Sequence, residues 1–397
     1  MGKLEELINK LCPNGVEYKN LESITKSVNI GINPRKFFKL NPDDATGFYV
    51  TVRELNGLNG VNQTEKTDLI NDNAINLIQT RANIEKGDIL FSNTGTVGKM
   101  ALVNSDILNW GVNEGIYVIK PIGDIIISKF LYYYLDSNLA YANYSRMFTG
   151  STMKHITQKA LLSLNIPVPP LEVQYEIVRI LDDFTLLSAE LSAELKARKK
   201  QYNYYRNALL SVNGKEYKLG DIANFKTGNK PKEILDVGEY EYINAGTTNS
   251  GYSREFNIDG NKVTTPSRGE GGIGFVGYQK NDFWLGPLCY AIWSKDENVI
   301  INKYLYYELS SKKDEILKRK NTGGVPALNG CDLKTIPINV PTIDEQKRIV
   351  SILDNFKKIC EDTTEGLPAE IEARNKQYEY YRDILLSFKE LKVSEVK

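Results

Sequence analysis

The sequence predicts an α+β fold, with two small α+β domains separated by two long helices and the whole arranged as a pseudo-twofold repeat. The stretch 174–211 contains no Pro or Gly, and its apolar residues recur at spacings of four and three. This heptad pattern is typical of a long helix that packs on a helical partner. The stretch 346–387 repeats it, since QKRIVSILDNF corresponds to QYEIVRILDDF and KQYEYYRDILLS to KQYNYYRNALLS. We therefore expect the two long helices to pack as an intramolecular antiparallel coiled coil.

The predicted seam of this coiled coil is mostly apolar or aromatic. Ser188 and Arg198 occupy the two remaining seam positions of the first helix. The seam tyrosines are expected to pack in the core with their hydroxyls at the rim. The seam residues are Ile177, Leu181, Phe184, Leu191, Leu195, Tyr202, Tyr205, Leu209, Ile349, Leu353, Phe356, Tyr378, Tyr381 and Leu385.

The repeat extends beyond the helices. KFLYYYL (Lys129–Leu135) matches KYLYYEL (Lys303–Leu309), and both segments predict short amphipathic aromatic helices. The segments that lead into the long helices, IPVPPLEVQ and INVPTIDEQ, also match. Their prolines favour extended backbone, and an acidic residue just before each helix suits the helix dipole. The predicted parts are a first domain, 1–170, a first long helix, 171–212, a second domain, 213–341, and a second helix with a tail, 342–397.

Each predicted domain contains short β-rich runs bounded by Gly, Asn and Asp, and each ends in a helix. Such a pattern indicates a small α+β domain. Between the strands lie polar loops, which suit variable surfaces on a fixed scaffold. The runs are GFYVTV (47–52), GDILFS (87–92) and GIYVIK (115–120) in the first domain, and GEYEYIN (238–244), GGIGFVGY (271–278) and PLCYAIW (287–293) in the second.

The two long helices are not identical. The first contains a tandem tetrad, in which SAEL (188–191) is followed at once by Ser192–Leu195. The second copy is four residues longer at this point and contains Gly366 and Pro368, which are expected to break or kink it. The first helix is therefore the more continuous spacer.

Composition removes most catalytic and metal-binding functions. The chain has a single histidine, His155, whereas acid–base machinery and zinc sites usually require several His or Cys residues. The four cysteines, Cys12, Cys289, Cys331 and Cys360, are far apart and are expected to be free thiols in a reducing compartment. No signal peptide or apolar run of membrane-spanning length is present, so we expect a cytoplasmic protein. The GxGxxG spelling at 272–277 is not followed by a helix pattern, so it does not predict a nucleotide site.

The formal net charge is zero, with 50 basic and 50 acidic residues. If the chain binds DNA, its basic residues must gather on one surface, or partners must hold much of the phosphate backbone. Basic residues with amides or hydroxyls nearby suit DNA contacts, and the run 318–321, which precedes the Thr-Gly-Gly turn 322–324, is the strongest cluster. The candidates are Arg35, Lys36, Arg53, Asn93, Lys99 and Lys154 in the first domain, and Lys226, Asn229, Lys230, Lys232, Ser267, Arg268, Lys318, Arg319, Lys320 and Asn321 in the second.

The order of these parts resembles the specificity subunit of type I restriction–modification systems. The resemblance covers essentially the whole chain and is most specific at IPVPPLEVQYEIVRILDDF with KARKKQYNYYRNALLS, and at their copies in 338–356 and 373–387. It departs at Val173, where the second copy has Glu345, and this affects one contact at the helix start. The motif KLCPNG near the N-terminus matches LLSVNG after the first helix, so the short N-terminal helix is expected to pack near the C-terminus and close the repeat.

The resemblance implies a non-enzymatic DNA-binding subunit with two target-recognition domains. Each would read one half of an asymmetric bipartite DNA sequence, and the helix pair would set the spacing between the halves. It also implies two modification subunits, which bind S-adenosylmethionine, methylate adenine and dock on the helices, and restriction subunits that join for cleavage. The specificity chain itself would hold no cofactor.

Two other functions stay open on the sequence. One is a coiled-coil adaptor whose tyrosine-rich surfaces bind other proteins, since Tyr204 and Tyr380 lie off the predicted seam and suit a protein interface. The other is a stand-alone methyltransferase or nuclease, which the missing motifs disfavour. An adjacent gene for a methyltransferase with an Asn-Pro-Pro-aromatic motif would favour the restriction interpretation, and its absence would favour the adaptor.

Overall fold

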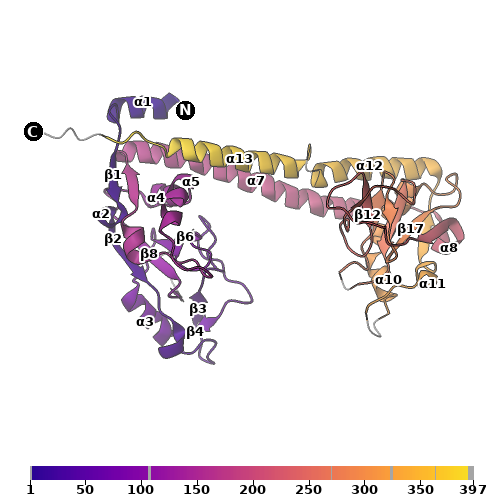
Figure 1. Cartoon of the computed structure of the whole chain (residues 1–397), viewed down its shortest axis with the longest axis horizontal. Helices are drawn as coiled ribbons and strands as arrows, with labels where there is room; N and C mark the ends of the chain where they lie inside the picture. The colour runs from indigo at the N-terminus through magenta and orange to yellow at the C-terminus, as the bar shows by residue number, and fades with distance from the viewer. Residues whose placement is uncertain (1, 106–108, 270, 322–324, 363, 392–397) are drawn as a thin grey trace, which may run out of the picture. The chain divides into compact units, whose positions relative to one another are not determined.

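The computed structural model describes residues 2–105, 109–269, 271–321, 325–362 and 364–391, and it confirms the α+β fold (Figure 1). The chain forms two compact units. Unit 1 consists of Met1–Glu190 with Glu372–Lys397, and unit 2 of Leu191–Ile371. The units divide the chain inside the long helices, because each globular segment packs on the nearest helix halves. The turn 322–324 lies outside the described residues.

Unit 1 contains a four-stranded sheet of order β2-β8-β5-β6, a three-stranded sheet of order β4-β3-β7 and a two-stranded ribbon, β1-β9. All the strand pairs are antiparallel except β3 with β7, which run parallel. The strands are β1 (Glu17–Asn20), β2 (Thr25–Ile30), β3 (Gly47–Val50), β4 (Leu69–Ile70), β5 (Ile89–Ser92), β6 (Met100–Leu102), β7 (Trp110–Val112), β8 (Ile116–Pro121) and β9 (Asn165–Val168).

Unit 2 has the same topology, although its sequence is largely different. Its sheets have the orders β11-β17-β14-β15, β13-β12-β16 and β10-β18, and β12 with β16 is again the parallel pair. The strands are β10 (Lys215–Lys218), β11 (Ala223–Thr227), β12 (Tyr240–Ile243), β13 (Tyr252–Ser253), β14 (Lys262–Pro266), β15 (Gly277–Gln279), β16 (Trp284–Leu285), β17 (Cys289–Ser294) and β18 (Pro337–Val340).

Short helices connect and cover these sheets. In unit 1, α4 and α5 lie between the sheet and the long helices (Figure 1). The helices of unit 1 are α1 (Gly2–Leu11), α2 (Leu21–Ile24), α3 (Asp72–Arg81), α4 (Ser128–Leu135), α5 (Asn138–Tyr144) and α6 (Gln158–Leu162), and those of unit 2 are α8 (Leu219–Ile222), α9 (Asn302–Ser311), α10 (Lys313–Lys318) and α11 (Gly330–Leu333). The long helices are α7 (Leu171–Leu210), α12 (Ile343–Glu361) and α13 (Leu367–Leu385).

Two aromatic pairs of the predicted seam lie between the long helices, although Tyr205 is 41% exposed. In unit 1, Phe184 of α7 stacks on Tyr381 of α13, with ring centroids 5.7 Å apart. In unit 2, Tyr205 of α7 stacks on Phe356 of α12, also at 5.7 Å. The partner's residue number falls as the residue number along α7 rises, which is the pairing that an antiparallel arrangement requires. Of the other seam residues, Ile177 is fully buried.

The predicted break in the second helix is also confirmed. Helix α12 ends at Glu361 and α13 begins at Leu367, whereas α7 is continuous over 40 residues. The Asp362 carboxylate accepts hydrogen bonds from the backbone N–H groups of Thr364 and Glu365 at 2.7 and 3.1 Å. A Cβ atom on Gly366 would lie 2.6 Å from the Asp362 carbonyl oxygen, so the break requires a residue without a side chain.

The N-terminal segment lies beside the C-terminal one, as the repeat predicts. The Val16 N–H donates to the Lys389 carbonyl at 2.9 Å, and the Leu391 N–H donates back to the Val16 carbonyl at 2.8 Å. The Tyr18 hydroxyl also donates to the Phe388 carbonyl at 3.0 Å. These contacts tie the two ends of the chain together within unit 1.

Three local expectations are corrected. Helices α4 and α9 are not amphipathic, because residues 130–135 and 304–309 are all buried between sheet and long helix. The run GGIGFVGY is a turn that ends in the short strand β15, since Gly274 adopts a φ of +93°. Helix α3 was not predicted, because its polar face is broad and its buried residues, Ala74, Ile75 and Ile78, are few. None of the helices in the described ranges is long and apolar enough to cross a membrane.

Candidate nucleic-acid interface

In unit 1, five loops from distant parts of the sequence meet at one edge of the sheets. Because β3 and β7 run parallel, their C-terminal ends lie together, and the Asn113 N–H donates to the Val50 carbonyl at 3.0 Å. The Ile32 N–H donates to the Val112 carbonyl at 3.2 Å, and this brings in the loop after β2. We call the residues of these loops the unit 1 loop edge: 31–36, 51–54, 93–99, 113–115 and 149–156.

The loop 93–99 joins the loops 113–115 and 149–156 through its backbone. The Asn93 N–H donates to the Gly115 carbonyl at 2.8 Å, and the Gly95 N–H donates to the Lys154 carbonyl at 2.8 Å. His155 is half-buried here, with Nδ1 2.9 Å from the Thr94 hydroxyl. The single histidine is thus hydrogen-bonded.

The loop edge brings together all six candidates of the first domain, but they are not equally free. Arg35, Lys36 and Lys154 are exposed. Asn93 is only 1% exposed, and its amide donates to the Glu114 carbonyl at 3.0 Å. Asn93 therefore stabilises the loops instead of offering its amide to a ligand.

The other two candidates in unit 1 are engaged with one another. The Lys99 ammonium donates to the carbonyls of Val52 and Arg53 at 2.7 and 3.3 Å, and so links two of the loops. The Arg53 side chain remains 55% exposed. Lys99 thus serves the fold of the loop edge, and Arg53 lies on its surface.

Unit 2 builds an equivalent edge. The Gly286 N–H donates to the Ile243 carbonyl at 2.8 Å, and the Asn229 N–H donates to the Leu285 carbonyl at 3.2 Å. The Leu328 N–H donates to the Ser267 carbonyl at 2.8 Å. We call the residues of these loops the unit 2 loop edge: 228–232, 244–250, 267–269, 286–288, 321 and 325–328.

The last pair of loops is joined in the same way in both units. In unit 1, His155 forms isolated β-bridges with Thr94 and with Thr149. In unit 2, Ala327 forms the equivalent bridges with Arg268 and Asn321. The backbone arrangement is therefore repeated, while the side chains that it presents are different.

The ten candidates of the second domain also separate into engaged and exposed groups. Ser267 is buried, the Lys226 ammonium donates to the Asn257 carbonyl at 3.0 Å, and the Asn229 amide oxygen accepts from the Asn257 amide. Arg319 lies outside the loop edge and donates to the Glu315 carbonyl at 2.9 Å. Five basic candidates remain, and within the described ranges none of them forms an ion pair. Lys320 is half-buried, and the other four are exposed: Lys230, Lys232, Arg268 and Lys318.

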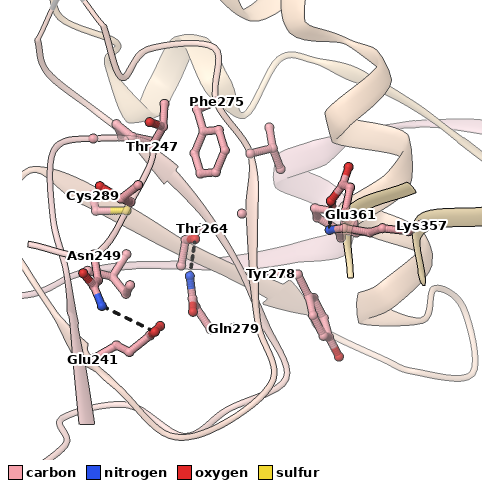
Figure 2. Close-up of a pocket in the computed structure, with 17 residues that line it drawn as sticks. Glu241, Thr247, Asn249, Thr264, Phe275, Tyr278, Gln279, Cys289, Lys357 and Glu361 are labelled. Atoms are coloured by element: carbon pink, nitrogen blue, oxygen red, sulfur yellow. Dashed lines mark hydrogen bonds and ion pairs between the residues drawn. The ribbon is translucent and has the colours of Figure 1, made fainter. Parts of the chain in front are cut away.

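A pocket of about 420 Å³ lies in unit 2 between the globular segment and α12 (Figure 2). Its lining includes Cys289, Phe275, Gln279 and Lys357. Burial raises the pKa of the Cys289 thiol to about 12, so the thiol stays protonated and is not a nucleophile. The Lys357 ammonium donates to the Tyr306 hydroxyl at 2.8 Å. We assign no reaction to this pocket.

Among the described residues, the cysteines and acidic side chains form no metal centre. Cys12, Cys289 and Cys360 are buried free thiols, and Cys331 is an exposed one. Across the residues that the structure describes, no group of three or more His, Cys, Asp or Glu side chains could hold a metal ion.

One contact that was not predicted from the sequence joins each globular segment to a long helix, and it is repeated in both units. In unit 1, the Tyr133 hydroxyl and the Lys129 ammonium both lie 2.6 Å from the Asp182 carboxylate of α7. In unit 2, Tyr307 hydrogen-bonds to Asp354 of α12, and Lys303 lies 3.4 Å from it. The matched segments KFLYYYL and KYLYYEL, with an aspartate at the same place in both long helices, contained the signal.

Comparison with known proteins accounts for this arrangement. The family described as "Type I restriction modification DNA specificity domain" matches residues 13–198 and 212–373. The chain is 36% identical over 293 residues to the Type I restriction enzyme EcoR124I/EcoR124II specificity subunit of Escherichia coli, which covers 66% of this chain and 70% of that protein. It is 33% identical over 322 residues to a putative type I restriction enzyme specificity subunit of Haemophilus influenzae, covering 73% and 81%.

Solved structures have the same fold. The S subunit of a type I restriction–modification system from M. genitalium matches with a TM-score of 0.54 and 20% identity over 94% of this chain and 95% of that one. A chain from a study of complex assembly and conformational transition of a type I system matches with a TM-score of 0.60 and 18% identity, over 94% and 98%. The family match favours the DNA-specificity interpretation over the adaptor. The chain therefore belongs to the family of type I restriction–modification DNA specificity subunits, the non-catalytic subunits with two target-recognition domains.

Proposed function

We propose that each unit reads one half of an asymmetric bipartite DNA target through its loop edge. The observation that carries this proposal is the repeated backbone arrangement with different side chains. Because the loop backbones are alike in the two units, both units should dock on DNA in the same way. Because their side chains differ, the two units should recognise different half-sites. The candidates in contact with DNA are the exposed basic residues of the two edges, and the continuous α7 with its partners α12 and α13 sets the gap between the half-sites.

The remaining functions belong to partner subunits. With a formal net charge of zero, the chain has too little basic excess to hold a long stretch of phosphate backbone alone. We infer that two modification subunits share the DNA, bind S-adenosylmethionine and methylate adenine, and that restriction subunits join them for cleavage in the cytoplasm. Tyr204 and Tyr380, which are 71% and 64% exposed on the long helices, are the candidates for their docking surface.

Methylation mapping tests the proposal. The chain is co-expressed with its modification subunit in a host without other adenine methylation, and methylated positions are mapped across the genome. We expect one motif made of two short, different half-sites with a fixed gap. Two unlinked motifs, or no motif, would contradict the proposal.

Charge variants of the loop edges sharpen this test. Arg35→Gln with Lys36→Gln acts on unit 1, and Lys230→Gln with Lys232→Gln is the matched pair in unit 2. If these side chains contact phosphates, each pair should weaken binding on all sequences and reduce the salt slope by roughly two, since each lost phosphate contact lowers it by about 0.9. The methylated motif should stay the same in both variants.

A further inference from the structure

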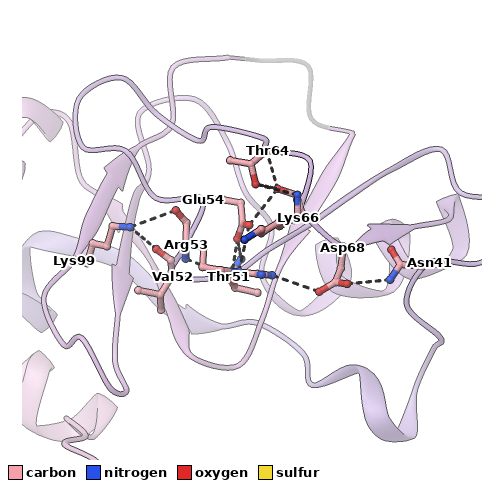
Figure 3. Close-up of polar contacts among 10 residues, drawn as sticks. Asn41, Thr51, Val52, Arg53, Glu54, Thr64, Lys66, Asp68 and Lys99 are labelled. Atoms are coloured by element: carbon pink, nitrogen blue, oxygen red, sulfur yellow. Dashed lines mark hydrogen bonds and ion pairs between the residues drawn. The ribbon is translucent and has the colours of Figure 1, made fainter. Parts of the chain in front are cut away.

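We propose that Arg53 is the base-reading arginine of unit 1, that it recognises a guanine, and that Asp68 positions it. The inference rests on the proposed function and names one specificity-determining residue within it. Its basis is that Arg53 is the one candidate of the unit 1 loop edge, among the described residues, that is both half-exposed and braced by carboxylates (Figure 3).

Two carboxylates lie within 4 Å of the Arg53 guanidinium. Its Nη2 atom lies 3.5 Å from Oδ2 of Asp68, and its Nε atom lies 3.7 Å from Oε1 of Glu54. The Nε atom also donates to the Thr51 hydroxyl at 3.4 Å. No hydrogen bond of Nη1 occurs in the described part of the chain, so this nitrogen has N–H groups left for a ligand.

Each carboxylate is itself held in place. The Glu54 carboxylate is fully buried and accepts hydrogen bonds from the Thr51 N–H at 2.8 Å, the Thr51 hydroxyl at 2.6 Å and the Thr67 hydroxyl at 3.2 Å. Asp68 accepts from the Asn41 amide at 2.9 Å. Asn41 adopts a left-handed φ of +55°, and its amide oxygen accepts from the Leu69 N–H at 2.8 Å.

The backbone beneath Arg53 is fixed as well. The Lys99 ammonium donates to the carbonyls of Val52 and Arg53, so the loop cannot move independently of its neighbour in the loop edge. A long side chain held in this way has already lost much of the rotamer freedom that binding would otherwise cost. Such a second layer of contacts is what a directional recognition group needs.

The local charge favours a base over a phosphate as the ligand of Arg53. Two carboxylates stand behind one guanidinium, so a phosphate at this point would meet a site without positive excess. A base edge carries no net charge, and a guanidinium fork matches the O6 and N7 acceptors of guanine in the major groove. Among the described residues, no carboxylate forms an ion pair with Arg35, Lys36 or Lys154, so these side chains suit phosphates, which require charge more than direction.

The test measures binding of the complete complex with modification subunits to duplexes that carry the mapped motif. Each G·C pair of the unit 1 half-site is replaced in turn by A·T. For the native chain we expect a loss of roughly 5- to 150-fold at the pair that Arg53 reads. Arg53→Gln should lose the same factor on the unchanged motif and should no longer discriminate at that one pair. Arg53→Lys should behave like Arg53→Gln at this pair, because it keeps the charge but not the fork.

Two further variants separate recognition from folding. Asp68→Asn should reduce discrimination at the same base pair. Its binding to unrelated DNA should stay equal or rise, because a negative charge is removed. A purely structural role of Asp68 would lower both the discrimination and the binding to unrelated DNA. Arg35→Gln is the control and should weaken binding without changing discrimination at any pair. The melting temperature of each variant shows whether it folds.

The outcomes separate this inference from the proposed function. If the native complex methylates a bipartite motif and Arg53→Gln keeps every base preference, the role of Arg53 is wrong and the proposed function stands. If relaxation occurs at an A·T pair, or in the other half-site, the guanine assignment is overturned. If the native complex has no bipartite motif, the proposed function itself fails.

Discussion

Gln174 is a single side chain whose replacement should loosen one unit and leave the other intact. It is fully buried at the start of α7 and makes three hydrogen bonds. Its amide oxygen accepts from the Ile127 N–H at 2.9 Å, and its amide nitrogen donates to the carbonyls of Ile125 at 3.0 Å and Pro169 at 2.8 Å. These bonds fasten the segment before α4 and the end of the preceding loop to the long helix.

Gln174→Met keeps the length of the side chain and removes all three bonds. Each backbone group left buried without a partner costs about 1–3 kcal/mol, so the loss should be about 3–6 kcal/mol once some repacking is allowed. Whole domains are stable by only about 5–15 kcal/mol, so this is a large share of the stability of unit 1. Gln346 makes the same three bonds in unit 2, to Ile301, Val299 and Pro341, so Gln346→Met is the matched variant.

Hydrogen exchange is the suitable assay, because a chain of two units need not unfold in one step and exchange reports each unit separately. We expect Gln174→Met to lower the protection of unit 1 alone and Gln346→Met that of unit 2 alone. The exposed Gln63, replaced by Met, is the control and should change neither. A loss below about 1 kcal/mol for Gln174→Met, or an equal loss in both units, would refute this reasoning.

The remaining predictions concern the helices. Deleting Ser192–Leu195 from the continuous α7 removes ~6 Å of helix rise, whereas DNA advances ~3.4 Å per base pair. Mapped methylation should therefore show both half-sites, with the gap between them changed by one or two base pairs. An unchanged gap would show that α7 does not measure the spacing. Hydrogen bonds from two cations, Arg179 and Lys3, lower the pKa of Glu176 from 4.5 to about 2. Because the folded pKa is the lower one, the stability that Glu176 adds is present above pH 4.5 and disappears between pH 4.5 and 2. The gap in melting temperature between the native chain and Glu176→Gln should narrow over that range, and a constant gap would argue against this linkage. Replacing exposed Tyr204 and Tyr380 by Arg should weaken binding of the modification subunit, titrated in solution, by about fivefold or more with the melting temperature unchanged; unaltered binding would show that neither tyrosine belongs to the docking surface.

The long helices were predictable because their signal is local and periodic. Heptad spacing places Ile177, Leu181 and Phe184 on one face whatever the rest of the chain does. Gly366 and Pro368 likewise predicted the break between α12 and α13, since neither suits the interior of a helix. The duplicated segments then predicted the repeat, and the structure shows it down to the paired roles of Gln174 and Gln346.

The roles of single candidates could not be predicted from residue type. Asn93 and Lys99 suited DNA contacts on the sequence, yet both satisfy backbone groups inside the loop edge. The burial of α4 on all sides was also hidden, because its tyrosine hydroxyls find partners far away in sequence, as Tyr133 does at Asp182. Whether such a polar side chain hydrogen-bonds to the protein itself or to a ligand depends on which groups the fold places beside it.

The sequence alone determined the repeated frame of this protein: two domains, the matched helices and the family to which they belong, since periodicity and duplication lie in the order of the residues. Only the tertiary structure decided which loops meet. The loop edge of unit 1 is held by backbone hydrogen bonds such as that between Gly95 and Lys154, which side-chain identity does not encode. The tertiary structure also decided that Asp68 braces Arg53, since the two residues meet only when the loop between them closes.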